Sequence, residues 1–186
     1  MNISSNDFKN GISIVVDGEI YTIVEFQHSK TARGSAFVRT KLKNLKSGLI
    51  LEKTFRAGEK VPRAYIETKK MQYLYRSDED LVMMDQETYE QLNLPSEMFG
   101  EGIKWIKEGD EVSVLFYEDQ PVALEIPKFV ELEVKHTEPG FKGDTATGGS
   151  KPATLETGAV VNVPLFVEIG DKIQVDTRSG EYLKRL

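Results

Sequence analysis

Residues 27–46 read Gln27-His28-Ser29-Lys30-Thr31-Ala32-Arg33-Gly34-Ser35-Ala36-Phe37-Val38-Arg39-Thr40-Lys41-Leu42-Lys43-Asn44-Leu45-Lys46. A short polar loop that contains Arg33 comes first, and a run typical of a β-strand follows it. Alternate residues of a strand point to one face, so we expect Arg39, Lys41 and Lys43 to form a basic ladder beside the loop. The stretch therefore predicts a hairpin with positive charge along one face and an exposed Arg33 at its end.

Two interpretations of this ladder are open on charge pattern alone. Evenly spaced cations suit the phosphate backbone of a nucleic acid, with one further cation pushed outward at the loop. Lysines are also common along solvated strand edges, where their charge discourages pairing with another chain. The pattern favours neither a phosphate-binding surface nor a solvated edge.

The composition is that of a globular, soluble protein. The chain has 186 residues, 29% charged and 39% hydrophobic, and this length allows two or three small domains. It has no cysteine, which excludes disulfides, thiol nucleophiles and thiolate metal sites. His28 and His136 are far apart and have no metal-ligand spacing. We therefore expect neither a metal nor a cofactor.

The sequence carries no sign of export or membrane insertion. Residues 1–7 lack the basic and apolar regions of a signal peptide. No apolar run approaches the length of about 20 residues that a membrane-spanning helix needs. We expect a cytoplasmic protein without a membrane partner.

Charge is distributed unevenly along the chain. Residues 1–63 have 11 Lys or Arg against 6 Asp or Glu, residues 64–127 have 5 against 15, and residues 128–186 have 8 against 9. The three segments are thus basic, strongly acidic and nearly neutral. The first should approach polyanions, whereas the second should be repelled by them or face protein or solvent.

The hydrophobic pattern is mostly that of β-strands. In the first segment, apolar residues alternate up to Asp17-Gly18, a strong hairpin signal, and resume at residues 20–24. With strands expected at 36–45 and 49–55, the count is four or five, which suits a small SH3-like barrel. Residues 58–62 interrupt the pattern because they contain Gly58 and Pro62, and they predict the first domain boundary.

Two further barrels are expected after this boundary. Strands at 71–75, 81–84, 112–117 and 122–126, with a short helix that has Ser96 as its N-cap, describe an OB-like unit. The third unit again alternates from residue 130, and in both units a Gly-Asp pair precedes an alternating strand, at 109–110 and 170–171. Trp105 is interpreted as core packing. The predicted fold class is all-β, with three small barrels in series over residues 1–63, 64–127 and 128–186.

A glycine-rich loop stands apart from the strands. It contains Gly143, Asp144, Thr145, Ala146, Thr147, Gly148 and Gly149. It superficially resembles a nucleotide-binding loop, but it lacks the required Lys and no apolar helix follows it. Its backbone N–H groups could contact RNA, or it could be an ordinary flexible connection between strands. No set of nucleophile, base and acid is identifiable, so the sequence does not support an enzyme.

Several stretches resemble the bacterial translation elongation factor P family, in order and over the full length. They are residues 26–28, 34–45, 52–60, 71–75, 143–148, 151–158 and 163–166. The resemblance implies an L-shaped, tRNA-like protein with a KOW/SH3-like domain followed by two OB-fold domains. It also implies binding of the 70S ribosome between the peptidyl and exit sites, and stimulation of peptide-bond formation at consecutive prolines.

The resemblance assigns roles to particular residues. In many members the first-domain loop reads Lys-Pro-Gly-Lys-Gly, and it reaches the acceptor end of the peptidyl-tRNA. Here the loop is Lys30, Thr31, Ala32, Arg33 and Gly34, so Arg33 is the candidate tip and modification site. Some members rhamnosylate an Arg at the tip, which implies an arginine-modifying enzyme as a partner. By the same resemblance, the loop at 143–149 lies near the messenger codon in the exit site.

The expected partners are therefore the ribosome, peptidyl-tRNA and ribosomal RNA, with the protein acting as a monomer. Arg39, Lys41 and Lys43 would bind the RNA backbone. One alternative is a general single-stranded RNA-binding OB-fold protein, although the acidic charge of residues 64–127 does not suit it. Another is a β-rich scaffold protein, which would leave the charge concentration at 27–46 without a purpose.

Overall fold

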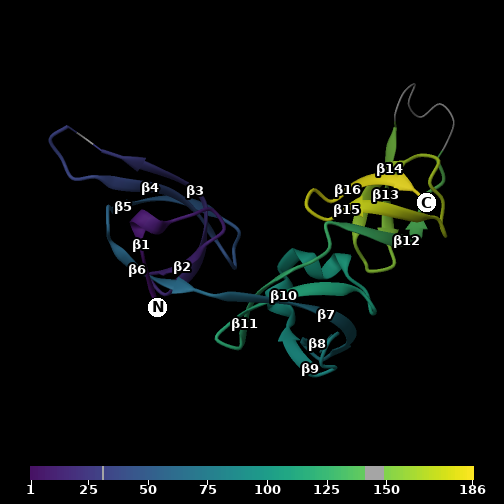
Figure 1. Cartoon of the computed structure of the whole chain (residues 1–186). Helices are drawn as coiled ribbons and strands as arrows, with labels where there is room; N and C mark the ends of the chain where they lie inside the picture. Colours follow the sequence, from purple (N-terminus) through teal and green to yellow (C-terminus); the bar gives the residue numbers. More distant parts are fainter. Residues whose placement is uncertain (31, 141–148) are drawn as a thin grey trace. The chain divides into compact units, whose positions relative to one another are not determined.

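The computed structural model describes residues 1–30, 32–140 and 149–186. Within these ranges the chain forms sixteen β-strands in three antiparallel sheets, with two short 3₁₀ segments. Figure 1 shows the strands labelled in chain order. The prediction of an all-β protein with three barrel-like domains is confirmed.

The first sheet is built from β1 (Asn2–Ser4), β2 (Ser13–Val16), β3 (Glu19–Ser29), β4 (Phe37–Asn44), β5 (Ile50–Arg56) and β6 (Lys60–Ala64). Their order is β1-β6-β2-β3-β4-β5, and a 3₁₀ turn at Ser5–Asp7 follows β1. The described residues thus form six strands in this sheet, where the sequence predicted four or five. β6 covers part of the predicted break at 58–62. Pro62 is tolerated because it faces Asn2 of β1, beyond the stretch of β6 that pairs with β2.

The second sheet contains β7 (Ile66–Ser77), β8 (Asp80–Asp85), β9 (Gln91–Pro95), β10 (Glu111–Tyr117) and β11 (Gln120–Glu125). The third contains β12 (Phe129–Thr137), β13 (Ser150–Leu155), β14 (Val160–Pro164), β15 (Lys172–Asp176) and β16 (Glu181–Arg185). Their orders are β11-β10-β7-β8-β9 and β14-β13-β12-β15-β16. In both sheets the first strand is central, with the second and third on one side and the fourth and fifth on the other. The two OB domains therefore share one topology.

The two Gly-Asp pairs form the same turn in these two sheets. Gly109 N–H donates to the carbonyl of Tyr73 at 2.7 Å, and Gly170 N–H donates to the carbonyl of Val134 at 2.9 Å. The Asp110 and Asp171 carboxylates each accept a backbone N–H three residues earlier, both at 2.9 Å. Both glycines have a positive φ, 95° and 92°, which other residues adopt only with strain. The pattern seen in the sequence is thus a repeated turn that ties the fourth strand to the first.

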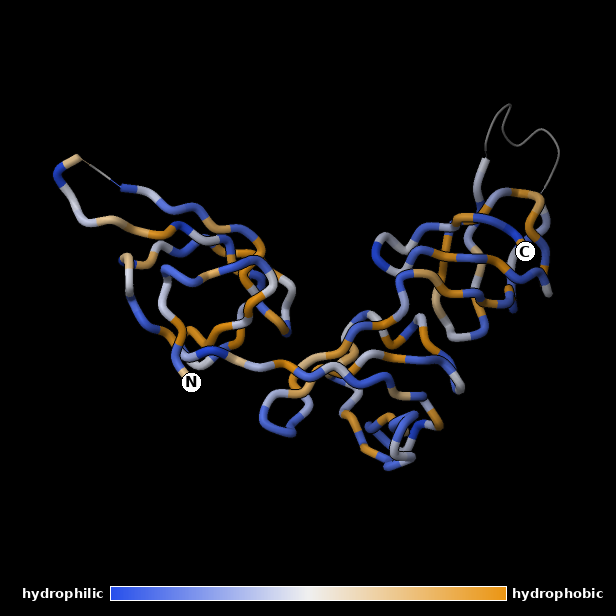
Figure 2. Tube along the Cα trace, in the orientation of Figure 1, coloured by the Kyte–Doolittle hydropathy of each residue, from blue (hydrophilic) through white to orange (hydrophobic). Residues whose placement is uncertain are grey.

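The core of the first sheet comes from alternate strand positions. Phe8 and Phe55 pack edge to face with their ring centroids 5.2 Å apart. They belong to a buried cluster that also contains Ile3, Ile14, Tyr21, Ile23, Val38, Leu42 and Val61. Figure 2 shows apolar and polar positions alternating along the strands. Burial of one face leaves the other face of β4 to solvent.

Trp105 is buried, as predicted for a core residue, but it packs among third-sheet residues. It is 4% exposed and belongs to the cluster that includes Leu132, Ala153 and Ile173. Nearby, Thr157 Oγ1 donates to the Lys104 carbonyl, and Lys107 Nζ lies 3.1 Å from Glu156 Oε1. The end of the 3₁₀ segment at Lys104 and Trp105, together with Lys107, is therefore fixed against the third barrel.

The helical segment before Trp105 differs from the prediction. Ser96–Trp105 is a 3₁₀ segment that is interrupted at Gly100, and Pro95 occupies the N-cap position without a side-chain hydrogen bond. The predicted N-cap role of Ser96 is wrong. By Cα packing the chain divides into two compact units, residues 1–69 with 114–124 and residues 70–113 with 125–186.

Candidate nucleic-acid interface

The tip loop connects β3 and β4, the most extensive hairpin of the first sheet. Pairing runs from Tyr21 opposite Asn44 to Ser29 opposite Phe37. At its base, Tyr21 Oη donates to Glu19 Oε2 at 2.9 Å and Asn44 Nδ2 donates to the same oxygen at 3.1 Å. The hydrogen bond to Glu19 raises the pKa of Tyr21, with burial adding to the effect, so Tyr21 stays a donor. The hairpin is paired from its base to its tip, with one register irregularity between Ile23 and Glu25.

Arg33 lies in the turn at the end of this hairpin. Its side chain is exposed, as are Lys30, Ala32 and Gly34, while Thr31 lies outside the described residues. Within the described part of the chain, Arg33 has no hydrogen bond or ion pair. A guanidinium offers five N–H donors and stays charged. The structure therefore leaves these donors available to an external acceptor such as phosphate or ribose.

The basic ladder is a single face of β4. Arg39, Lys41 and Lys43 are exposed, whereas the intervening Thr40 and Leu42 are buried. Thr40 Oγ1 donates to the Lys53 carbonyl at 2.7 Å, which holds β5 beside β4. The alternation expected from the sequence is present, with all three cations on the outer face.

The middle cation of the ladder differs from the other two. Lys41 pairs across the sheet with Glu25 on β3 and with Glu52 on β5. Its Nζ lies 3.2 Å from Glu25 Oε2, and the two side chains are 47% and 66% exposed. Arg39 and Lys43 instead face uncharged residues on both sides, namely Gln27, Thr54, Thr22 and Ile50. The unbalanced positive charge is therefore at the two ends of the ladder.

A shallow hollow of about 420 Å³ lies over this part of the sheet. Its lining comes from β3, β4 and β5 and includes Glu25, Gln27, Arg39, Lys41, Glu52 and Thr54. Carboxylates, cations, an amide and a hydroxyl thus converge on one open surface. Such a surface can hold a polar, charged chain, but it has no enclosed apolar cavity for a small molecule.

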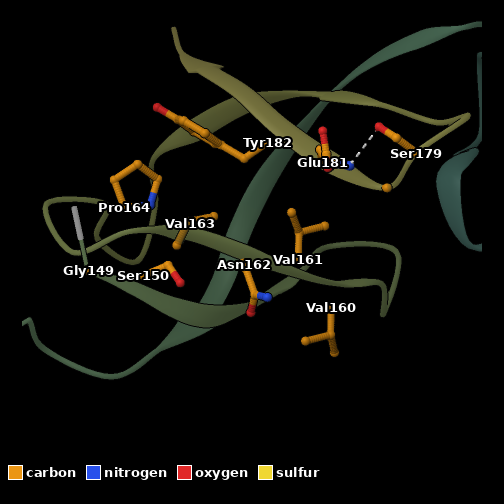
Figure 3. Close-up of a pocket in the computed structure, with 11 residues that line it drawn as sticks. Gly149, Ser150, Val160, Val161, Asn162, Val163, Pro164, Ser179, Glu181 and Tyr182 are labelled. Atoms are coloured by element: carbon orange, nitrogen blue, oxygen red, sulfur yellow. Dashed lines mark hydrogen bonds between the residues drawn. The ribbon is translucent and has the colours of Figure 1, made fainter.

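Most of the predicted exit-site loop lies outside the described residues. This applies to Gly143, Asp144, Thr145, Ala146, Thr147 and Gly148. Gly149, the last residue of the stretch, lines a hollow of about 610 Å³ between β14 and β16. Figure 3 shows the side chains that reach it from these two strands, among them Asn162 and Tyr182, and the hydrogen bond from Glu181 N to Ser179 Oγ, 3.3 Å long.

The described residues beside this loop are firmly held. Lys151 is buried, and its Nζ donates to the Glu138 carbonyl at 2.6 Å. Thr137 is also buried, and its Oγ1 donates to the Pro152 carbonyl at 3.0 Å. The two strands on either side of residues 138–149 are thereby joined by side chains as well as by the sheet.

Neither a metal site nor a membrane-spanning helix is found among the residues that the structure describes. Among the described residues, no group of three or more His, Asp or Glu side chains is placed to hold a metal ion. His136 Nε2 lies 3.4 Å from Glu138 Oε1, with both side chains mostly exposed. No helix within the described ranges is long and apolar enough to cross a membrane.

Sequence reasoning did not identify Glu25 and Glu52 as part of this surface. Their spacing carries no signal, because they lie on different strands and meet Lys41 only through the pairing register. The expected strand ended at residue 24, whereas β3 continues to Ser29, so Glu25 was left outside the predicted pairing. Counting the register back from the loop would have placed Glu25 opposite Lys41, because the irregularity of this pairing comes only between Ile23 and Glu25.

Comparison with known proteins assigns all three segments to one family. Residues 4–61 match the model described as elongation factor P (EF-P) KOW-like domain, residues 66–124 match the elongation factor P OB domain, and residues 130–185 match elongation factor P, C-terminal. Elongation factor P of Carboxydothermus hydrogenoformans is 55% identical over 99% of this chain and 100% of its own length. That of Coprothermobacter proteolyticus is 58% identical over 99% of both chains.

Solved structures give a more distant likeness. The structure described as eukaryotic translation initiation factor 5A from Methanococcus jannaschii is 25% identical, with a TM-score of 0.53 over 67% of this chain and 94% of that one. An initiation factor 5A family protein from Naegleria fowleri, 19% identical, has a TM-score of 0.52 over 68% of this chain and 98% of its own. The second shows the fold alone.

Proposed function

The chain belongs to the elongation factor P family, and we propose that it binds the ribosome between the peptidyl and exit sites. There it would stimulate peptide-bond formation where consecutive prolines stall synthesis. Membership of the family makes the protein a translation factor that is not an enzyme. The action at consecutive prolines, the binding position on the ribosome and the roles of individual residues are our proposals.

The observation that carries the proposal is an exposed Arg33 at the end of a firmly paired hairpin. Peptidyl transfer needs the peptidyl ester and the incoming amine to be held in attack geometry. Proline makes this geometry harder to reach, because its ring restricts the backbone of the chain. A protein that immobilises the tRNA acceptor end lowers the entropic part of the barrier without donating or accepting a proton. Arg33 suits this role because its donors have no partner among the described residues.

The other predicted residues would support this contact. Lys30, Thr31, Ala32 and Gly34 would shape the loop around Arg33. Arg39, Lys41 and Lys43 are proposed to face the RNA backbone, and the stretch Gly143 to Gly149 the exit-site codon. The hydrogen bonds of Thr137 and Lys151 support the last proposal, because they fix the strands from which that stretch departs.

The exposure of Arg33 also supports modification by an enzyme. The side chain is accessible and has no ion pair within the described residues, so an arginine-modifying enzyme could reach its guanidinium. We further propose that the protein acts as a cytoplasmic monomer with domains at 1–63, 64–127 and 128–186. Its partners would be the 70S ribosome, peptidyl-tRNA and ribosomal RNA.

The absence of cysteine provides a direct test of the binding position. An Arg33→Cys variant carries a unique thiol to which a hydroxyl-radical probe can be attached. On ribosomes with peptidyl-tRNA, we expect cleavage at the acceptor end of that tRNA. A probe on Thr88→Cys, an exposed position of the second domain, is the control and should cleave elsewhere. Cleavage by the position-33 probe only at sites away from the acceptor end would overturn the proposal.

A further inference from the structure

We propose that Glu25 and Glu52 set the specificity of the first domain for its RNA target by neutralising the middle of the basic ladder. All three cations then face the RNA backbone, but only Arg39 and Lys43 contact phosphates, because Lys41 is neutralised while both carboxylates are present. This inference rests on the proposed function, since it concerns how the same ladder faces RNA. It adds two acidic residues whose role is to limit binding.

The strand register places the charges. Residues directly opposite in an antiparallel sheet have Cβ atoms about 4.5–5.5 Å apart, and Lys41 has such a neighbour on each side. The Glu25 carboxylate is already at 3.2 Å from Lys41 Nζ. A phosphate that approached Lys41 would meet one ammonium and two carboxylates, so the local charge opposes it.

The two ends of the ladder are electrostatically separate from each other. Arg39 and Lys43 are four residues apart on β4, which is about 13 Å along a strand. This exceeds the Debye length of about 8 Å at physiological salt, so each end acts largely on its own. The hollow lined by Glu25 and Glu52 leaves room above Lys41. Charge rather than bulk therefore keeps phosphate from the middle.

A fully basic ladder would bind any RNA backbone. Phosphate contacts supply affinity that does not depend on sequence, and each added contact strengthens all targets alike. Carboxylates within the ladder weaken that general affinity and leave discrimination to other contacts, such as those of Arg33. The carboxylates thus raise specificity for the proper RNA target by repelling the phosphates of other RNAs.

A double-mutant cycle tests the arrangement on full-length protein. We would measure how the affinity for a 20-base-pair RNA duplex depends on salt, in the wild type and in Glu25→Gln/Glu52→Gln, each with and without Lys41→Met. The Gln pair should steepen the log–log slope by about one unit, because Lys41 becomes available to a phosphate. Lys41→Met should leave the slope unchanged in the wild type and cancel the gain in the Gln pair.

The matched control removes two other carboxylates. Glu67 and Glu79 are exposed and have no ion pair among the described residues, so Glu67→Gln/Glu79→Gln changes the net charge equally. An equal steepening in this control would overturn the inference, and so would an equal loss of slope on Lys41→Met in both backgrounds. Thermal unfolding confirms that each variant is folded. The same proteins are assayed for binding to 70S ribosomes. Failure of the wild type to bind ribosomes would contradict the proposed function. The salt slopes for the RNA duplex would still show whether Glu25 and Glu52 limit phosphate binding.

Discussion

Glu156 joins the second and third barrels through one carboxylate oxygen. Its Oε1 accepts the backbone N–H of Glu133 at 3.0 Å and lies 3.1 Å from Lys107 Nζ. Burial by itself would raise the pKa of Glu156, but the hydrogen bonds from Glu133 and Lys107 outweigh it and lower the pKa. The folded state therefore favours the ionised carboxylate.

The sign of this shift predicts a pH dependence. A pKa that is lower in the folded state contributes stability above the unfolded-state value and loses it as pH falls through the folded-state value. We expect Glu156→Gln to lower the unfolding temperature at pH 7, with the difference from wild type shrinking below the ordinary glutamate pKa of 4.5. Glu168→Gln, at an exposed position, should change little at either pH. A Glu156→Gln difference that grew on acidification would contradict the assignment.

Trp105 shows where residue-level prediction stops. A tryptophan in an apolar helical pattern is correctly expected to be buried. Its neighbours are nevertheless residues such as Leu132 and Ile173, which follow it by more than twenty positions. Sequence patterns indicate which face of an element is buried. The hydrophobic core against which that face packs depends on the tertiary arrangement of the elements.

Among the elements, β4 was predicted most fully because its information is local. Alternation alone places Val38, Thr40 and Leu42 inside, and the structure confirms it. β6 was not predicted because it contains Pro62, which has no backbone N–H to donate to a neighbouring strand. Pro62 is accommodated because it faces Asn2 of β1, a strand sixty residues away in the sequence. Glu25 was missed for a different reason, because the predicted strand stopped one residue before it, whereas β3 continues to Ser29 and pairs Glu25 with Lys41. Pairing between distant strands therefore accounts for β6, and the underestimated length of one hairpin accounts for Glu25.

The ends of β4 carry the next prediction. Arg39→Ala and Lys43→Ala should each weaken ribosome binding and reduce the log–log salt slope by about one unit or less, since each removes one phosphate contact. Lys46→Ala, an exposed cation beyond the end of β4, is the control. Salt titrations of binding measure the slopes. Unchanged slopes for both variants would identify the ladder as a solvated edge.

The repeated turn before β15 makes a stability prediction. Gly170 has a φ of 92° and donates to Val134. Gly170→Ala should destabilise the protein by about 1 kcal/mol or more, because a side chain disfavours positive φ. Ile169→Ala, in the same turn and 60% exposed, should cost much less. Denaturant unfolding compares the two, and equal effects would show that the turn tolerates a side chain at 170.

At the scale of the whole molecule, charge separates the domains by task. The basic first segment carries the exposed Arg33 and the ladder, whereas residues 64–127 hold 15 acidic against 5 basic residues. We expect the acidic segment, which lies in sequence between the two proposed RNA-contacting stretches, to reduce binding to RNA in other orientations. The family comparison confirmed the order of KOW-like and OB domains that the resemblance implied.

The central claim is that Arg33 accelerates peptide-bond formation by positioning the peptidyl-tRNA. The most direct measurement is the rate of Pro-Pro-Pro synthesis on purified ribosomes with wild-type protein, with Arg33→Ala and without the factor, beside a template that lacks proline. Arg33→Ala should remain folded because the side chain is exposed. The account predicts that it loses most of the stimulation on the proline template and that the other template responds to neither protein. A folded Arg33→Ala variant that sustained the wild-type rate through three prolines would contradict the account.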